Sequence, residues 1–367
     1  MPDILKMAEE IKAVSPAAAL DYDTHKESII DEVNRLITAD PSVKGLIGQN
    51  PLSVMYDNHA NHAIFMSNVF LLNDYQLMIR VITWVYRSYT ARGFSVEYFP
   101  ATLKTWITVI GKALKPASAS QITAVYKWII DRHNLFKEAS EKVILEESIF
   151  DEKWSKIQSA FHNALLSGDR QEAIKLSNDS VQTASDLAEF YLKVIQPSLY
   201  RIGVQWEMGD ISVAQEHLAS AIVTRVMSLL YPKFVVMEQS KGKAVVTAAP
   251  NEFHEIGARM VADLLEADGW DVDYTGANLP VEELLEFLKV KKPFLTAISV
   301  GMPFNLDKAM ELVSLIRKDQ QLDKMKIILG GLSISSNPQL KFPNGVDGTG
   351  STAQDAIRLA SEWWDNA

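Results

Sequence analysis

"APNEFHEIGARM", residues 249–260, decides the fold because one structural rhythm changes into another within it. Before it stands the short apolar run "KAVVTAA", which predicts a buried strand, and after it comes "MVADLLEADGW", which predicts an amphipathic helix. His254 is therefore expected where the carboxyl end of a strand leads into a helix. In open α/β sheets ligands bind at this edge, so the stretch raises the question of what His254 holds.

The same alternation continues to the end of the chain. The runs "DVDYTG", "FLTAISV" and "KIILGG" predict further strands, and helical stretches such as "PVEELLEFLKVK" and "LDKAMELVSLIRKD" separate them. Strands that alternate with helices form a parallel, doubly wound sheet. Residues 240–367 are therefore predicted to be a Rossmann-like domain.

Two helical segments precede this domain. Residues 146–235 contain about the helical content of a four-helix bundle. Residues 1–145 show apolar side chains three and four apart, with Pro and Gly between the runs, which predicts an all-helical domain. The fold class is thus a multidomain α and α/β protein.

Composition excludes several kinds of protein. The chain has 367 residues, a formal charge of −10 and no cysteine, and residues 1–140 hold 14 basic and 14 acidic residues. No basic patch for nucleic acid is expected, and thiolate metal sites or a thioether-linked chromophore are impossible. No apolar run approaches the roughly 20 residues of a membrane span, and the start does not resemble a signal peptide. We therefore expect a cytoplasmic protein without a membrane partner.

Residues with binding chemistry gather at the predicted strand ends. Glycines there let a backbone approach a bulky ligand. Glu252 could hydrogen-bond one ring nitrogen of His254 and leave the other for a metal. A lone loop histidine is more often a satisfied polar residue, so the chemistry alone leaves both interpretations open. The residues expected at this edge are His254, Ser299, Gly301, Gly330, Gly331, Gly348 and Gly350.

Three short motifs carry a family resemblance. "EFHEIG" at 252–257, "SVG" at 299–301 and "GG" at 330–331 resemble the [D/E]-x-H-x-x-G, S-x-[L/G] and G-G signatures of cobalamin-binding domains. The resemblance implies that His254 replaces the cofactor's benzimidazole as the lower cobalt ligand. It also implies a groove for the displaced nucleotide tail, lined by Gly257, Ser299, Gly301, Gly330, Gly331 and Thr349. Methyltransferases and mutases commonly have Asp at the position of Glu252. The resemblance here is to the light-sensing branch, in which Glu replaces that Asp.

A second motif lies in the predicted bundle. Trp206 is followed after nine residues by Glu216 and His217, and this spacing resembles the W-x9-EH signature of adenosylcobalamin photoreceptors. Ser212 with Gln215 reads as a capping box, which predicts a helix starting at Val213. The resemblance implies that Trp206 packs over the adenosyl group, with Val213, Glu216 and His217 around it. Each side chain by itself is more often an ordinary core or surface residue.

The chain departs from the photoreceptor pattern directly after Trp206. Transcriptional relatives carry a histidine there that caps cobalt after photolysis, whereas this chain has Glu207. A bis-histidine photoproduct through position 207 is therefore impossible. His217 or water would have to take the upper site.

Residues 1–145 resemble a globin-like domain in their length and long aromatic helices. That arrangement ahead of a cobalamin domain is similar to the photocobilins, which implies noncovalently bound biliverdin. Arginines would clamp the propionates, and tyrosines would close around the rings. The ordinary alternative is that these residues are core or solvated surface. The candidate bilin residues are His59, His62, Arg80, Tyr86 and Arg87.

The sequence predicts a light sensor that is not an enzyme. It would bind adenosylcobalamin and biliverdin, and Co–C photolysis would change its quaternary structure, which implies a homo-oligomer with light-dependent assembly. Two alternatives stay open. One is a corrinoid protein that carries methyl groups in a methyltransferase system, and the other is a haem-binding globin sensor fused to a cobalamin domain.

Overall fold

The computed structural model describes residues 2–142, 151–233, 239–336 and 345–367. The chain divides into two compact units. The first comprises Met1–Leu145 with Gln205–Asp210, and the second comprises Glu146–Val204 with Ile211–Ala367. The predicted segment boundaries near 145 and 235 lie outside the described residues. No helix within the described residues combines the length and hydropathy needed to cross a membrane.

The first unit is helical, as predicted, and its likeness to globins stays a prediction. Helix α2 packs against α4, α6 and α7, around buried aromatic side chains that include Tyr22, Phe70, Trp106 and Tyr126. Its helices are α1 (Pro2–Lys6), η1 (Met7–Glu10), α2 (Pro16–Thr38), α3 (Val43–Ile47), α4 (Leu52–Leu72), α5 (Tyr75–Thr90), α6 (Tyr98–Ala113), α7 (Pro116–Asp131) and α8 (His133–Ser140).

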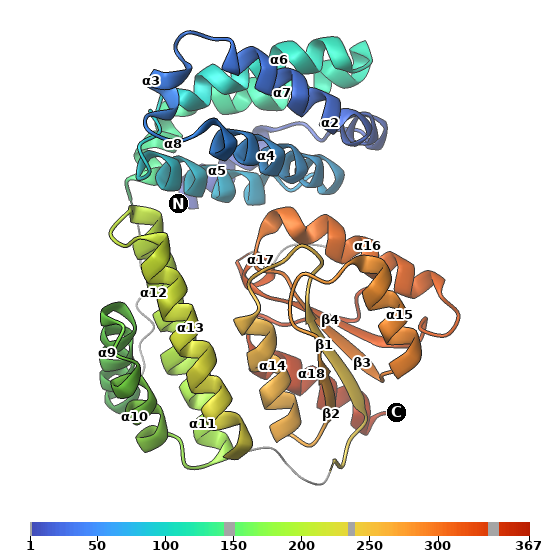
Figure 1. Cartoon of the computed structure of the whole chain (residues 1–367). Coiled ribbons are helices and arrows are strands. Elements are labelled where there is room, and N and C mark those ends of the chain that lie inside the picture. The colour runs from blue at the N-terminus through green and yellow to red at the C-terminus, as the bar shows by residue number, and fades with distance from the viewer. Residues whose placement is uncertain (1, 143–150, 234–238, 337–344) are drawn as a thin grey trace. The chain divides into compact units, whose positions relative to one another are not determined.

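The second unit begins with four helical rods, as the sequence predicts for a bundle (Figure 1). The third rod contains one π-helical segment, η2, between two α-helical parts. Such bulges are rare and are found mostly at functional sites. The rods are α9 (Glu152–Ser167), α10 (Arg170–Ser180), the continuous α11 (Ala184–Phe190), η2 (Tyr191–Ile195) and α12 (Gln196–Met208), and α13 (Val213–Leu230), followed by η3 (Tyr231–Lys233).

A parallel sheet of order β2-β1-β3-β4-β5 completes this unit and confirms the predicted Rossmann-like domain. Its strands are β1 (Lys243–Ala248), β2 (Asp271–Tyr274), β3 (Leu295–Ser299), β4 (Lys326–Gly330) and β5 (Gly348–Thr349). Its helices are α14 (Ile256–Ala267), α15 (Val281–Lys291), η4 (Pro303–Asn305), α16 (Leu306–Lys318), α17 (Leu332–Ser335) and α18 (Ala353–Asp365).

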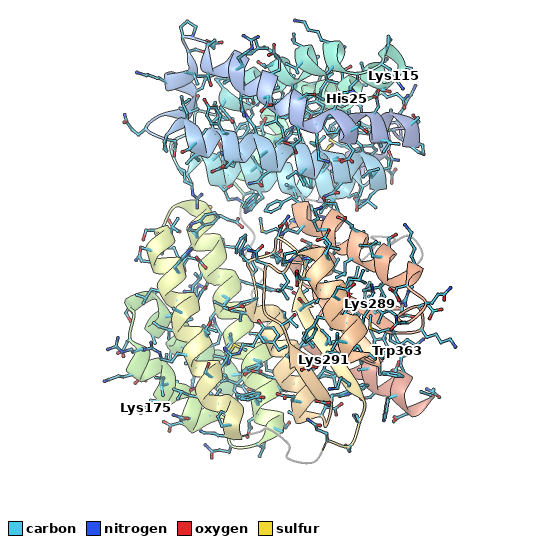
Figure 2. All side chains as sticks on the ribbon, turned by 45° about the vertical axis from the view of Figure 1, so that its right-hand side comes forward. His25, Lys115, Lys175, Lys289, Lys291 and Trp363 are labelled. Carbon is cyan, nitrogen blue, oxygen red and sulfur yellow. The ribbon has the colours of Figure 1, made fainter. Side chains whose placement is uncertain are left out.

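Helices cover both faces of the sheet. Small residues of α14 and α18, including Ala258 and Ala360, pack on Val246 and Ala297 on one face, while α15 and α16 lie on the other (Figure 1). Polar contacts hold the same helices. Lys291 Nζ of α15 lies 2.9 Å from Asp273 Oδ1 of β2, and Figure 2 shows its place on that helix. Trp363 of α18 packs so tightly on Gly348 that an added Cβ would lie 3.1 Å from the indole. The helices packed on both faces therefore hold the strands, and their carboxyl ends, in place.

Helix α14 also joins the sheet to the bundle. Met260 and Leu264 belong to the bundle's apolar core. On the same helix Asp263 is 7% exposed and accepts a 2.7 Å hydrogen bond from Tyr191 Oη of the π-helical segment. Burial raises the pKa of Asp263 from its ordinary 3.8 to about 6, although Tyr191 and Arg259 act against this rise.

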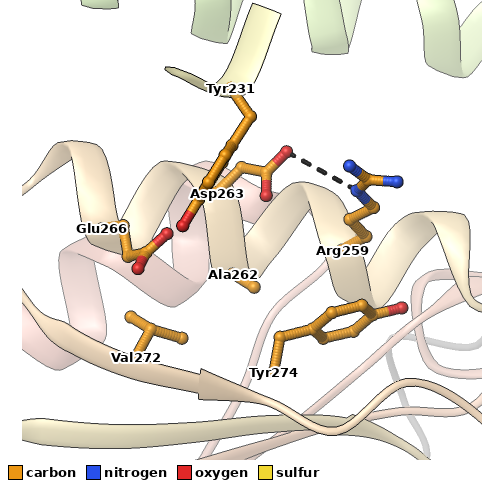
Figure 3. A pocket seen from close by; sticks show the side chains of 7 residues that line it. All are labelled: Tyr231, Arg259, Ala262, Asp263, Glu266, Val272 and Tyr274. Atoms are coloured by element: carbon orange, nitrogen blue, oxygen red, sulfur yellow. Dashed lines mark ion pairs between the residues drawn. The ribbon is translucent and has the colours of Figure 1, made fainter. Parts of the chain in front are cut away.

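A cavity of about 380 Å³ lies beside this junction (Figure 3). Its lining includes the ion pair between Arg259 Nε and Asp263, at 4.0 Å, and the side chains of Glu266, Tyr231 and Tyr274. Burial also raises the pKa of Glu266. The cavity lining therefore holds two carboxyl groups, Asp263 and Glu266, and one arginine, Arg259.

We predict that Asp263→Asn raises stability at neutral pH. The folded pKa lies above the unfolded one, so the contribution of Asp263 is fully present below pH 3.8 and is lost as pH rises through about 6. The whole loss corresponds to roughly 3 kcal/mol at most. Thermal unfolding should show a larger gain for Asp263→Asn at pH 7.5 than at pH 5. Asp365→Asn, at the chain end, is the control. A loss of stability at both pH values would mean that the Arg259 pair outweighs the burial cost.

Candidate functional site

The strand ends come together as the sequence predicts. Ala248, Ser299 and Gly330 are register partners on the adjacent strands β1, β3 and β4, and Thr349 pairs with Leu329. The loop that carries His254 leaves β1 at this edge and leads into α14. An added Cβ at Gly301 would lie 3.0 Å from the His254 Cβ. His254, Ser299, Gly301, Gly330 and Thr349 therefore share one edge of the sheet.

Glu252 fixes the histidine. Its Oε1 lies 2.5 Å from His254 Nδ1 and also accepts from the His254 backbone N–H at 3.1 Å. The hydrogen bond with Glu252 raises the pKa of His254. The His254 side chain is 66% exposed, and no described residue hydrogen-bonds to its Nε2. With Nδ1 occupied, Nε2 is the nitrogen that remains available to a metal.

The other Glu252 oxygen is held as firmly. Oε2 accepts from the backbone N–H groups of Gly301 (2.9 Å) and Met302 (2.7 Å) and from Asn305 Nδ2 (3.0 Å). The carboxylate is fully buried, which would raise its pKa, but these bonds and the one with His254 bring the pKa down to about 2. Glu252 is therefore an anion that the segment after β3 holds in place and that orients His254 through its other oxygen.

Asn305 was missed by sequence reasoning. It lies six residues beyond Ser299, in the single turn of η4, and it is 3% exposed. An asparagine two residues after a proline, in the turn that follows a strand end, is the signal that could have found it. Its amide is a donor to the same carboxylate that holds the histidine.

The glycines allow close backbone packing along this edge. Gly331 has φ +95°, and an added Cβ there would lie 2.5 Å from the Val300 carbonyl oxygen, so a side chain is excluded. A Cβ at Gly330 would lie 3.1 Å from the Gly350 oxygen. Gly257 stands beside Ser299, with 3.7 Å between an added Cβ and the serine Oγ. The ends of β3, β4 and β5 are thus packed backbone against backbone, and only residues without a side chain fit at Gly331.

The bundle contributes the start of α13. Ser212 and Gln215 form the predicted capping box, and the helix begins at Val213 as predicted. Glu216 Oε2 lies 2.6 Å from His217 Nδ1, and the Glu216 charge adds to the raised pKa of His254. Val213 is 50% exposed and Phe253, next to His254, is 73% exposed. Apolar and acidic groups thus accompany the exposed histidine.

Trp206 and Glu207 belong to the first unit, within the segment Gln205–Asp210. Arg92 stacks on the Trp206 ring with its guanidinium carbon 3.6 Å from the ring centroid. Arg87 Nη1 donates to Glu207 Oε2 at 2.8 Å. Glu207 is thus paired with an arginine.

The structure scatters the candidate bilin residues. Arg87 is committed to Glu207 and to the Ser140 carbonyl, and the Tyr86 hydroxyl lies 2.9 Å from His133 Nδ1. Arg80 differs, because its Nε is buried without a hydrogen-bond partner among the described residues. A bilin clamp formed by both arginines would therefore require the Glu207 pair to open.

His59 and His62 lie within the helical core. His59 has both ring nitrogens engaged, Nδ1 with Asn34 Oδ1 at 2.6 Å and Nε2 with the Tyr98 hydroxyl at 2.9 Å. His62 Nε2 lies 3.1 Å from the Tyr126 hydroxyl. Burial lowers the pKa of His59 to about 4 and that of His62 to about 3, so both are neutral. In this arrangement His59 offers no free nitrogen to a haem iron.

Comparison with known proteins identifies the cofactor class. Residues 242–358 match a family model described as a B12 binding domain, and residues 157–231 match a second model with the same description. The chain is a cobalamin-binding protein. The two matched segments contain the sheet with His254 and the helical bundle, respectively.

Several relatives are corrinoid proteins. Monomethylamine corrinoid protein 2 of Methanosarcina mazei is 23% identical over 212 residues, which is 56% of this chain and 96% of the relative. The solved monomethylamine corrinoid protein of Methanosarcina barkeri is 20% identical, with a TM-score of 0.49, over 57% of this chain and 99% of that chain. The methanol:cobalamin methyltransferase complex MtaBC of the same organism is 18% identical, with a TM-score of 0.30, over 66% of this chain and 93% of that chain.

We predict that His254→Ala weakens cobalamin binding by about 100-fold or more. The variant removes the exposed imidazole that Glu252 orients, whereas loss of an orienting partner alone typically costs 10- to 100-fold. Spectral titration with cobalamin measures the affinity and the lower ligand together. His25→Ala, a histidine far along the sequence in the first unit, is the matched control. An unchanged spectrum for His254→Ala would show that His254 is not the cobalt ligand.

Proposed function

We propose that this chain binds cobalamin with the benzimidazole displaced and His254 as the lower cobalt ligand. The observation that carries the proposal is the buried Glu252 carboxylate, which occupies His254 Nδ1 and leaves the exposed Nε2 for a metal. Gly301, Gly330 and Gly331 would border the displaced nucleotide tail, with Ser299 and Thr349 beside them. When bound, the cobalt would supply a weak Co–C bond to an exchangeable upper ligand.

The function that the relatives favour is a corrinoid carrier. The similar proteins from Methanosarcina are named as methylamine corrinoid proteins, and their match spans nearly their whole length. In this role the upper ligand is a methyl group, and a methyltransferase is the partner. His254 would keep cobalt in place from below while the methyl group enters and leaves above.

A light sensor that uses adenosylcobalamin is the second candidate. It is favoured by the spacing of Trp206, Glu216 and His217. Trp206 lies near the end of α12, and Glu216 and His217 lie in the first turns of α13, which begins at Val213. Loss of the adenosyl group would free the surface that Trp206 covers, and a homo-oligomer would change its assembly. Residues 1–145, which lie outside both matched segments, would belong to this function.

One experiment separates the candidates. The dark protein is titrated with adenosylcobalamin and with methylcobalamin, and its size is measured by gel filtration before and after green light. A sensor should prefer adenosylcobalamin, lose that preference in Trp206→Ala and change size on illumination, because the indole covers the upper ligand. Leu229→Ala, an exposed change on the same bundle, is the control. Equal affinity for both cobalamins with no size change would support the carrier.

Biliverdin in the first unit extends the second candidate. Its support is the aromatic core, the buried Nε of Arg80 without a hydrogen-bond partner among the described residues, and the two neutral histidines. A bilin carboxylate would supply the acceptor that Arg80 lacks. Without cysteine in the chain, the chromophore would be noncovalent.

We predict that co-expression with a haem oxygenase yields a red-absorbing protein that releases its pigment on denaturation. Arg80→Leu should lower the bilin content several-fold because a propionate loses its cation, while Arg35→Leu, an exposed arginine, should not. Haem added to the same protein tests the alternative of a haem-binding globin sensor, because bound haem would give a Soret band. A colourless full-length protein would leave residues 1–145 as a helical domain without a tetrapyrrole.

A further inference from the structure

The segment Gln205–Asp210 is set apart from its neighbours in the chain. It belongs to the first unit, whereas Val204 and Ile211 on either side belong to the second. It contains Trp206, the residue that the proposed light sensor would place over the upper ligand. Whatever holds this segment therefore holds that indole.

Arg92 holds the indole directly. Its guanidinium carbon lies 3.6 Å from the centroid of the Trp206 ring, and its Nη2 donates to the Trp206 carbonyl at 3.0 Å. The other arm, Nη1, donates to the Ser88 carbonyl at 2.6 Å, near the end of α5. One arginine thus links α5 to both the ring and the backbone of Trp206. It therefore occupies one face of the indole.

Glu207 provides a second attachment. Arg87 Nη1 lies 2.8 Å from its carboxylate, with the two side chains only 12% and 18% exposed. Arg87 Nε also donates to the Ser140 carbonyl at 3.0 Å, which anchors the arginine to the end of α8. Burial raises the pKa of Glu207, and the hydrogen bonds from Arg87 and Trp84 oppose that rise. The pair is therefore shielded from solvent and well anchored.

Gly209 completes the fit. It has φ +78°, and an added Cβ would lie 3.2 Å from the Ala91 carbonyl oxygen. A left-handed glycine turn thus brings the segment against the residue next to Arg92. A cation on a ring, an ion pair and a close backbone contact together define one docked conformation of Trp206.

We propose that Arg92 is a positioning residue through which the first unit sets the upper-ligand selectivity of the cobalamin site. Arg92 restrains the Trp206 indole to one orientation, and Arg87 restrains the adjoining backbone through Glu207. A restrained indole covers a bulky adenosyl group without first losing rotamer freedom, whereas a small upper ligand gains little from it. This inference rests on the proposed position of Trp206 over the upper ligand.

The test is a double-mutant cycle on full-length protein. The ratio of the adenosylcobalamin and methylcobalamin dissociation constants is measured for Arg92→Leu, Trp206→Ala and the double variant. Arg92→Leu should lower the selectivity at least 5-fold, and the double variant should lose no more than Trp206→Ala alone. Arg92→Lys, which keeps a cation over the ring, should retain most of the selectivity. Arg201→Leu, an exposed arginine on α12, is the matched control and should leave it unchanged.

Two further readouts keep the result interpretable. Hydroxocobalamin has no bulky upper ligand, so its affinity and its His-on spectrum should stay unchanged in folded Arg92→Leu. Amide hydrogen exchange across 205–210 should become faster in that variant. Unchanged selectivity in Arg92→Leu, while Trp206→Ala loses it, would overturn the role of Arg92 and leave the position of Trp206 intact. Unchanged selectivity in Trp206→Ala would instead overturn the position of Trp206, and the proposal with it.

Discussion

The buried carboxylate of Glu252 is the constraint on which the site depends. A charge in the interior is costly unless hydrogen bonds compensate for it, and Glu252 receives them from His254, Asn305 and the backbone of Gly301 and Met302. The donors lie on two loops at the carboxyl edge of the sheet, His254 on the loop after β1 and the other three on the segment after β3. The same atoms that satisfy the anion therefore fix the loops, and the fixed loops aim His254. Folding of this edge and orientation of His254 are one event.

The sequence predicted the elements whose pattern is local. Alternating apolar strands and amphipathic helices placed β1 to β4 and the helices α14, α15, α16 and α18, and the Ser212–Gln215 pair placed the start of α13. It did not predict β5, because two residues that include a glycine carry no periodic signal. Nor did it predict the π-helical segment Tyr191–Ile195, because a single-residue insertion barely alters a helical pattern.

Long-range partners were beyond local reasoning. Glu252 and His254 are two residues apart, so their hydrogen bond was predicted, whereas Asn305 is 53 residues from Glu252 and was not. Arg87 also has a distant partner. Its helical spacing from Arg80 suggested a paired clamp for a bilin, but the spacing carried no information about Glu207, which lies 120 residues away and pairs with Arg87. The structure distinguishes the two arginines: one has its carboxylate partner and the other has a buried Nε without one.

The pair between Arg87 and Glu207 also bears on what distinguishes the two proposed functions. A histidine below the cobalt serves a methyl carrier and a light sensor equally well, so the lower ligand cannot separate them. The difference must lie above the corrin, where a carrier needs access for a partner and a sensor needs cover. In this chain the residue after Trp206 is Glu207, which pairs with Arg87 of α5, and Trp206 itself is stacked on Arg92. If Trp206 covers the upper ligand, as proposed, opening that face requires the contacts with Arg92 and Arg87 to break, so any partner that needs access must offset their loss.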